Sequence, residues 1–324
     1  MTGSRRIAAA VVAVATVAVA GCGLGPGESE EGTASLRVTR DHGAELIDEA
    51  TLSDPTESET VVRFLDRETD IETSYGGNFV DSIDGISSAV EGGRSLDWYY
   101  YVNGYWSPIG AGEATVHAND RIWWDYRDWT DSYRVPAVVG SYPEPFRSGL
   151  NGTRVPTELV CYPSGTDGGA CDEVEASLTD AGADLTTTTP AQAEDGKDTL
   201  RVLVGDWDEV RADRAAQMLE GGPGESGVFA EPVRCDGGWA LQALSADKTV
   251  QGTGTDAGWI ATVQLAEDQP TWLVSATDAD ALDAAAAMLD EETLRDHYAV
   301  ASFGAEPVPL PAPDPIPDLQ KVTC

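Results

Sequence analysis

The tightest constraint on the fold of this chain is an Asn-Gly pair, Asn103-Gly104, between two short aromatic runs. The run WYYYV precedes the pair and the run YW follows it. Asn-Gly is typical of the two-residue type I′ turn, because both central residues of that turn need a positive φ angle. Residues 98–106 are therefore predicted to form a β-hairpin with aromatic strands.

Side chains alternate across a strand, so the rings of the first strand divide between two faces of a sheet. We expect Trp98 and Tyr100 to lie in the core beneath a helix, because a half-buried strand is the usual arrangement. Tyr99 and Tyr101 lie on the opposite face. If they are uncovered, they form an apolar patch that marks a contact site; the alternative is that the second domain covers them.

Further elements are predicted around the hairpin. Residues 35–40 alternate as a strand, and Asp54-Pro55 is interpreted as an N-cap with proline at the first helical position. Apolar residues at helical spacing continue this helix through residues 61–65. Two short strand runs in residues 70–86 are separated by a Gly-Gly pair.

A last strand, residues 120–126, places Trp123 on the same face as Tyr99 and Tyr101. One helix among the strands of a curled mixed sheet is a β-grasp-like arrangement. We therefore expect an N-terminal β-grasp-like domain over residues 34–130.

Three motifs of this region also carry a family resemblance. They are YGGNFVDSIDGI, DWYYYVNG and NDRIWWDY, which begin at Tyr75, Asp97 and Asn119. Together they resemble the transcobalamin-like C-terminal domain of many bacterial surface lipoproteins. Asn119 replaces the usual glycine, a change that still suits a turn. In transcobalamin and intrinsic factor the related domain helps to enclose cobalamin. The resemblance thus implies capture of a small, cobalamin-like ligand near a membrane transporter.

The candidate ligand-binding residues are aromatic, because rigid rings hold a planar ligand at little entropy cost. They are Tyr75, Tyr99, Tyr101, Trp106 and Trp123. No metal and no resident cofactor is expected at this site.

The N-terminal residues 1–21 are predicted to be a lipoprotein signal peptide. Arg5 and Arg6 precede an apolar run that is too short for a mature membrane-spanning helix. The sequence VAGC resembles the lipobox, which makes Cys22 the lipid anchor; an ordinary signal peptide is the alternative. Residues 22–33 are rich in Gly and Glu, as expected of a flexible tether. We expect a protein anchored at the extracytoplasmic face of the cell membrane.

Four cysteines remain after Cys22: Cys161, Cys171, Cys235 and Cys324. An even number outside the cytoplasm favours disulfides over metal or redox chemistry. Cys161 and Cys171 are the expected local pair, since a short loop of turn-forming residues joins them. The other two cysteines would then tie the last residue to the body of the protein. Four cysteines permit three connectivities, and the sequence does not distinguish between them.

The formal net charge of -36 excludes nucleic acids and anionic lipid headgroups as partners. An acidic surface suited to salty surroundings and a GC-rich genome both explain this composition. Charge of this kind concerns solubility and does not determine the fold.

Residues 157–304 are predicted to form a second domain of α/β type, because strand and helix signals alternate there. Strands are expected at residues 157–162, 199–207, 238–244, 258–265 and 271–277, and helices at 171–180, 208–219 and 278–296. Residues 131–156 are a Pro-interrupted connection between the domains. Residues 305–324 are a Pro-rich C-terminal tail, extended and either packed or solvated.

Catalytic motifs are not visible in the sequence. His42, His117 and His297 are far apart and lack a His or Cys companion at metal-ligand spacing. Ser164 and Ser226 do not fit the G-x-S-x-G pattern. We therefore expect a non-enzymatic lipoprotein that captures a small ligand. The alternative is a structural or adhesion module of the cell envelope that docks protein or glycan; a hydrolase is third.

Overall fold

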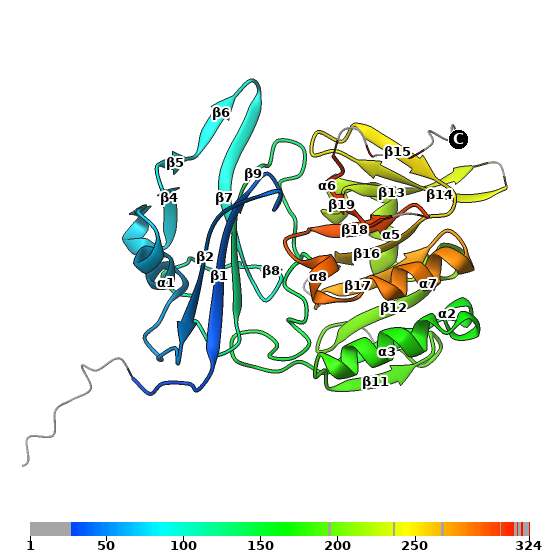
Figure 1. Cartoon of the computed structure of the whole chain (residues 1–324), viewed down its shortest axis with the longest axis horizontal. Helices are drawn as coiled ribbons and strands as arrows, with labels where there is room; N and C mark the ends of the chain where they lie inside the picture. Colours follow the sequence, from blue (N-terminus) through cyan, green and yellow to red (C-terminus); the bar gives the residue numbers. More distant parts are fainter. Residues whose placement is uncertain are drawn as a thin grey trace, which may run out of the picture.

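The computed structural model describes residues 27–193, 196–235, 237–266, 269–304, 306–313, 316, 319 and 324. The predicted signal peptide and Cys22 lie outside these residues. The described residues form an N-terminal half built on one sheet and a C-terminal half of α/β type, which confirms the predicted fold class (Figure 1). Among the described residues, no helix is long and apolar enough to cross a bilayer.

The N-terminal half is built on a mixed sheet in the order β2-β1-β9-β7-β6, with β8 paired to β7. Its strands are β1 (Thr33–Arg40), β2 (Glu45–Ser53), β6 (Ala89–Glu91), β7 (Arg94–Val102), β8 (Tyr105–Trp106) and β9 (Arg121–Asp128). β1 pairs antiparallel with β2 and parallel with β9. The first and last strands of this half therefore lie side by side, as a β-grasp-like arrangement requires.

One face of this sheet carries the only long helix of the described N-terminal half, α1 (Val61–Glu68), and a small second sheet. That sheet contains β3 (Ile71–Ser74), β4 (Phe79–Ile83) and β5 (Ile86–Ser87), and the single turn η1 (Tyr75–Gly77) joins its first two strands. Trp98 and Tyr100 pack in the same hydrophobic cluster as Phe64 and Leu65 of α1. The predicted core face of the hairpin strand is thus confirmed.

The helix begins later than predicted. It starts at Val61, after Thr60, whereas Asp54 follows directly on β2 and has a φ of 50°. The Asp54 carboxylate accepts a hydrogen bond from the Gly32 N–H at 3.1 Å, and the Asp54 N–H donates to the Gly32 carbonyl at 2.7 Å. The Asp-Pro pair therefore closes the β1–β2 ladder and does not cap a helix.

The Asn-Gly hairpin forms as predicted. Asn103 and Gly104 have φ values of 54° and 82°, as the turn requires. The Asn103 amide nitrogen donates to Asp120 at 2.7 Å and to the Gly149 carbonyl at 2.8 Å. Burial raises the pKa of Asp120 to about 6, and the hydrogen bonds from His117 and Asn103 oppose that shift. These hydrogen bonds therefore fix the turn to Asp120, just before β9, and to Gly149 in the connection between the domains.

The C-terminal half contains a sheet in the order β11-β10-β12-β17-β16-β18-β19. Its strands are β10 (Thr157–Cys161), β11 (Leu185–Thr188), β12 (Leu200–Asp206), β16 (Gly258–Val263), β17 (Thr271–Ala276), β18 (Ala299–Ser302) and β19 (Val308–Leu310). β10, β11, β12 and β17 run parallel, and the remaining pairs are antiparallel. The Pro-rich C-terminal segment is therefore packed in part, because it supplies β19.

Both faces of this sheet are covered. The helices α2 (Pro163–Gly168), α3 (Ala170–Asp180) and α7 (Ala279–Ala287) lie on one face. The other face packs against a second sheet and short helices. These elements are β13 (Ala230–Cys235), β14 (Gly238–Leu244), β15 (Val250–Gly254), α4 (Trp207–Val210), α5 (Arg214–Gln217), η2 (Met218–Gly221) and α6 (Pro223–Ser226).

Two predicted helices are each divided into shorter pieces. Within residues 208–219, the Asp213 carboxylate accepts from the Ala215 N–H and begins α5. Within residues 278–296, Asp290 caps α8 (Glu291–Leu294) in the same way. Aspartates inside an apolar-periodic run thus begin new helices, because their side chains compete for backbone N–H groups. The disulfides Cys161–Cys171 and Cys235–Cys324 are both present, which confirms the preferred pairing.

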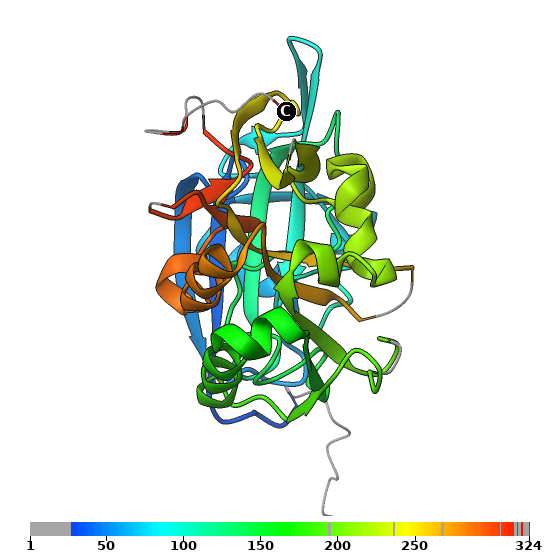
Figure 2. The same cartoon turned by 90° about the vertical axis from the view of Figure 1, so that its right-hand side faces the viewer.

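The two halves share one hydrophobic core. The face of the first sheet opposite α1 packs against the C-terminal half, which lies in front of that sheet in Figure 2. Tyr99, Tyr101 and Trp123 belong to the same buried cluster as Phe229 and Tyr298 of the C-terminal half.

Candidate functional site

The five predicted ligand residues do not form one open surface. Tyr101 is completely buried, Trp123 and Tyr99 are nearly so, and Tyr75 is 85% exposed at a separate place. The Tyr298 ring lies edge-on to both Tyr101 and Trp123, with centroids 5.8 and 5.4 Å away. The expectation of an open ligand face over Tyr101 and Trp123 is therefore corrected: the second domain covers it, as in the alternative considered above.

A buried polar cluster accompanies these rings at the interface. The Asp125 carboxylate accepts hydrogen bonds from the Thr39 hydroxyl at 2.6 Å and the Tyr298 hydroxyl at 2.8 Å. It also accepts from the backbone N–H groups of His42 at 3.1 Å and Gly43 at 3.0 Å. Burial raises the pKa of Asp125 and lowers the pKa of His42 to about 3. These contacts join β1, β9 and the C-terminal half.

An aromatic cleft of about 330 Å³ opens at the margin of the interface. Its walls come from the start of β4, the middle of β7, the segment after β8 and the chain that follows β9. We call this the aromatic cleft; its apolar lining includes Phe79, Tyr99, Trp106, Ile109, Trp129 and Tyr133. Tyr99 and Trp106 are thus the two predicted ligand residues that reach an open cavity together.

Four rings of the aromatic cleft form a continuous series. Tyr99 contacts Trp106 at a centroid distance of 6.2 Å, and Trp106 contacts Tyr133 at 6.0 Å. Tyr133 in turn lies edge-on to Trp129 at 5.8 Å. Tyr133 is 60% exposed, and Phe79 and Ile109 are also exposed. Large apolar side chains that remain exposed around one cavity mark a contact site.

Polar contacts fix the walls of the aromatic cleft. The Arg127 guanidinium lies 3.9 Å from the Tyr99 ring centroid and donates to the backbone carbonyls of Ser132 at 2.8 Å and Tyr133 at 3.0 Å. The Tyr100 hydroxyl donates to the Ile109 carbonyl at 2.5 Å, and burial raises the pKa of Tyr100 to about 12. The Tyr99 ring and the backbone of Ser132, Tyr133 and Ile109 are therefore held in place before any ligand arrives, which lowers the entropy cost of binding.

The contribution of the chain that follows β9 was not predicted from the sequence. Trp129 and Tyr133 follow the last strand of the N-terminal half, where no regular element was expected. Their aromatic side chains were a usable signal, because large rings outside regular elements must either pack against the protein or contact a ligand. Their closeness to Tyr99 and Trp106 could not be predicted from the sequence, because it depends on how the chain turns back after β9.

The described residues contain no group of three or more His, Cys, Asp or Glu side chains that could hold a metal ion. His42 lies between the Phe229 and Tyr298 rings, and His117 pairs with Glu30 at 2.8 Å. The Ser164 hydroxyl donates to Glu209 at 2.5 Å, and the Ser226 hydroxyl donates to the Gly222 carbonyl at 2.8 Å. The chemistry that the aromatic cleft offers is stacking and apolar contact.

Comparison with known proteins finds one family model that matches part of the chain. Residues 58–128 match the family "Domain of unknown function (DUF4430)", and this range contains all three motifs quoted above. A solved structure from Ruminococcus gnavus ATCC 29149, described as "a putative metal binding protein", is similar at 16% identity. The similarity covers 30% of this chain and 98% of that chain, with a TM-score of 0.24. No curated protein matches this chain.

Proposed function

We propose that this protein is a lipid-anchored, extracytoplasmic binding protein that holds a small planar ligand in the aromatic cleft. The observation that carries the proposal is the series of rings Tyr99, Trp106, Tyr133 and Trp129 around an open cavity. Aromatic rings provide large apolar contact areas and specific stacking geometry. Their fixed positions supply that area without the ordering cost of flexible side chains.

The resemblance of the three motifs to the transcobalamin-like domain supports a corrinoid-like ligand. Ligand pockets usually measure about 300–1,000 Å³. The aromatic cleft, at about 330 Å³, would enclose a small planar molecule or one edge of a larger ring system. Delivery of that ligand to a membrane importer is the role that the resemblance adds.

Binding is tested by following thermal unfolding and tryptophan fluorescence while corrinoids and other planar cofactors are added. A ligand at a hundred times its dissociation constant stabilises the fold by about 2.7 kcal/mol, which raises the melting temperature by several degrees. Tyr133→Ala and Trp129→Ala are expected to remove most of this shift. Tyr75→Ala is the matched control, because Tyr75 is exposed and lies outside the cleft lining. A shift that survives both cleft variants would place the ligand elsewhere.

Anchoring is tested separately at Cys22. Because the lipobox ends at this residue, Cys22→Ala is expected to lose membrane retention and to carry no lipid at its N-terminus. Fractionation and mass spectrometry of the mature protein measure both properties. Unchanged fractionation, without lipid mass on the wild-type N-terminus, would contradict the anchor.

A structural role in the cell envelope is the second candidate. It draws support from the exposure of Phe79, Ile109 and Tyr133, which suits docking of a protein segment or glycan as well as a small molecule. Binding of envelope glycans that is lost in Tyr133→Ala, with no response to planar cofactors, would favour this role.

A further inference from the structure

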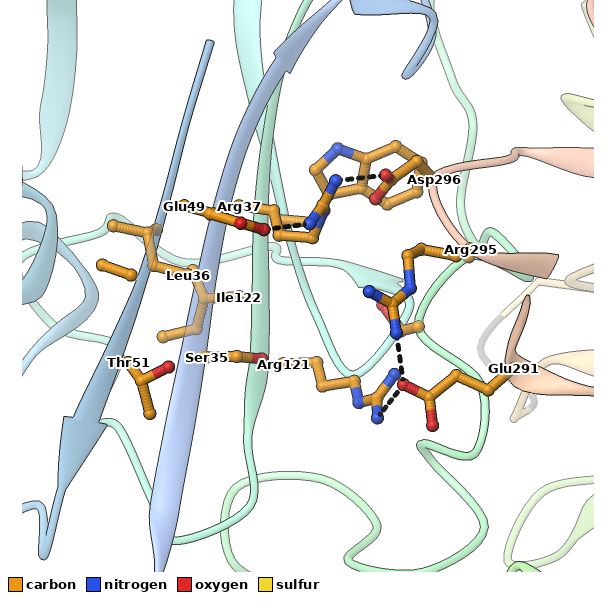
Figure 3. A pocket seen from close by; sticks show the side chains of 14 residues that line it. Ser35, Leu36, Arg37, Glu49, Thr51, Arg121, Ile122, Glu291, Arg295 and Asp296 are labelled. Atoms are coloured by element: carbon orange, nitrogen blue, oxygen red, sulfur yellow. Dashed lines mark hydrogen bonds and ion pairs between the residues drawn. The ribbon is translucent and has the colours of Figure 1, made fainter. Parts of the chain in front are cut away.

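A second cavity, of about 500 Å³, lies between the two halves and is separate from the aromatic cleft. One wall comes from β1, β2 and β9, and the other from α8 and the residues after it (Figure 3). Arg37, Arg121 and Arg295 all line it. The chain has 20 Lys and Arg residues against 56 Asp and Glu, so a cavity with three guanidinium groups departs from the acidic character of the protein.

The charges of this cavity divide into two groups of opposite sign. Arg37 pairs with Glu49 at 2.6 Å and also with Asp296, so one guanidinium meets two carboxylates. At the other end, Arg121 and Arg295 both pair with Glu291 Oε1, at 2.9 and 3.0 Å. This end holds two guanidiniums and one carboxylate, and its net charge is positive.

The positive end is already oriented for an oxyanion. Arg121 Nη1 donates to the Tyr142 carbonyl at 2.7 Å, which fixes the plane of its guanidinium. In Figure 3 the side chains of Arg121 and Arg295 extend from opposite walls toward the same Glu291 oxygen. Guanidinium groups present forked N–H donors that match carboxylate and phosphate oxygens. Glu291 therefore marks where an oxygen of a bound anion fits.

Gly140 also lines the cavity and is closely packed against Trp123 and the His297 backbone. A Cβ atom there would lie 2.8 Å from Trp123 Cζ3 and 2.9 Å from the His297 backbone nitrogen. The hydroxyl-bearing residues Ser35 and Ser141 line the same space. The cavity thus combines a charged end with uncharged polar groups able to contact the rest of a small molecule.

We propose that this cavity binds a small molecule through a carboxylate or phosphate group held by Arg121 and Arg295. Glu291 occupies the place of that group while the cavity is free. The Glu291 side chain is 41% exposed, and exposed ion pairs stabilise a fold little, so an incoming oxyanion displaces it readily. This site is independent of the proposed ligand in the aromatic cleft.

The test is titration of the full mature protein with inorganic phosphate and with acetate, at constant ionic strength set by chloride. Arg295→Gln is expected to raise the Kd by about tenfold or more, because a charge-assisted hydrogen bond is lost. Glu291→Gln is expected to lower the Kd, because the competing carboxylate is removed. Binding of phosphate alone or acetate alone would identify which oxyanion the site prefers.

Arg211→Gln is the matched control. Arg211 is a partly exposed arginine of the C-terminal half that pairs with Glu220 at 2.7 Å and does not line this cavity, so its loss is expected to leave the Kd unchanged. A purely structural ion pair predicts the opposite pattern: Glu291→Gln lowers the melting temperature without tightening binding. That result, or absence of binding in both wild type and Glu291→Gln, would overturn the proposal. Neither outcome tests the binding of planar ligands, which is tested instead by Tyr133→Ala and Trp129→Ala.

Discussion

Replacement of Tyr101 by alanine is expected to lower the free energy of unfolding by about 3–5 kcal/mol, the usual cost of removing a buried aromatic ring. Tyr101 is completely buried, and its ring contacts Trp123 and Tyr298. Its removal leaves a cavity in the core that the two halves share. Because the core is shared, we expect one unfolding transition in wild type and variant alike, measured by chemical denaturation and calorimetry.

Tyr133→Ala is the control for this prediction. Tyr133 is 60% exposed, so its loss is expected to change stability by no more than about 1 kcal/mol. An equal and small effect of both substitutions would show that Tyr101 is not part of the core. Separate transitions for the two halves would show that their interface opens before either half unfolds.

Asp125→Ala is expected to lower the free energy of unfolding by about 3 kcal/mol or more. The substitution removes the acceptor of two hydroxyl groups and two backbone N–H groups, from Thr39, Tyr298, His42 and Gly43. Each buried donor left without an acceptor costs about 1–3 kcal/mol, and neighbouring losses do not simply add. Urea denaturation measures the total.

Two variants separate this effect from the loss of any aspartate. Asp128→Ala changes the end of the same strand, where the carboxylate accepts only from Thr130 in the described contacts, and a change within about 0.5 kcal/mol is expected. Tyr298→Phe removes a single donor, and a loss of about 1 kcal/mol is expected. If Asp125→Ala is as mild as Asp128→Ala, the polar cluster does not hold the two halves together.

The proposed ligand sites use the interface differently. The four-ring series of the aromatic cleft draws Tyr99 and Trp106 from the N-terminal sheet and Trp129 and Tyr133 from the chain that follows β9. The arginine-lined cavity needs both halves, since Arg121 and Glu291 are 170 positions apart in the sequence. Loosening the interface through Asp125 is therefore expected to weaken oxyanion binding more than planar-ligand binding.

The sequence by itself determined the features that depend on neighbouring residues. A positive φ at two consecutive positions fits Asn103-Gly104, and alternation along β7 assigns Trp98 and Tyr100 to one face. The short loop between Cys161 and Cys171 favoured their pairing, which the structure contains. The predicted start of a helix at residue 278 also depends on neighbouring residues, because the Asp278 carboxylate accepts from the Ala281 N–H and caps α7.

Only the tertiary structure decided whether the second face of the hairpin is open. Tyr99, Tyr101 and Trp123 alternate in the same way whether water or protein covers them, so their spacing contains no information on that point. The cover comes from residues distant in the sequence, such as Tyr298, whose hydroxyl reaches Asp125 across 173 positions. Asp54 shows the same limit, since its partner is Gly32, directly before β1, and not a following helix. Local rules fix which side chains share a face, and long-range packing decides what that face meets.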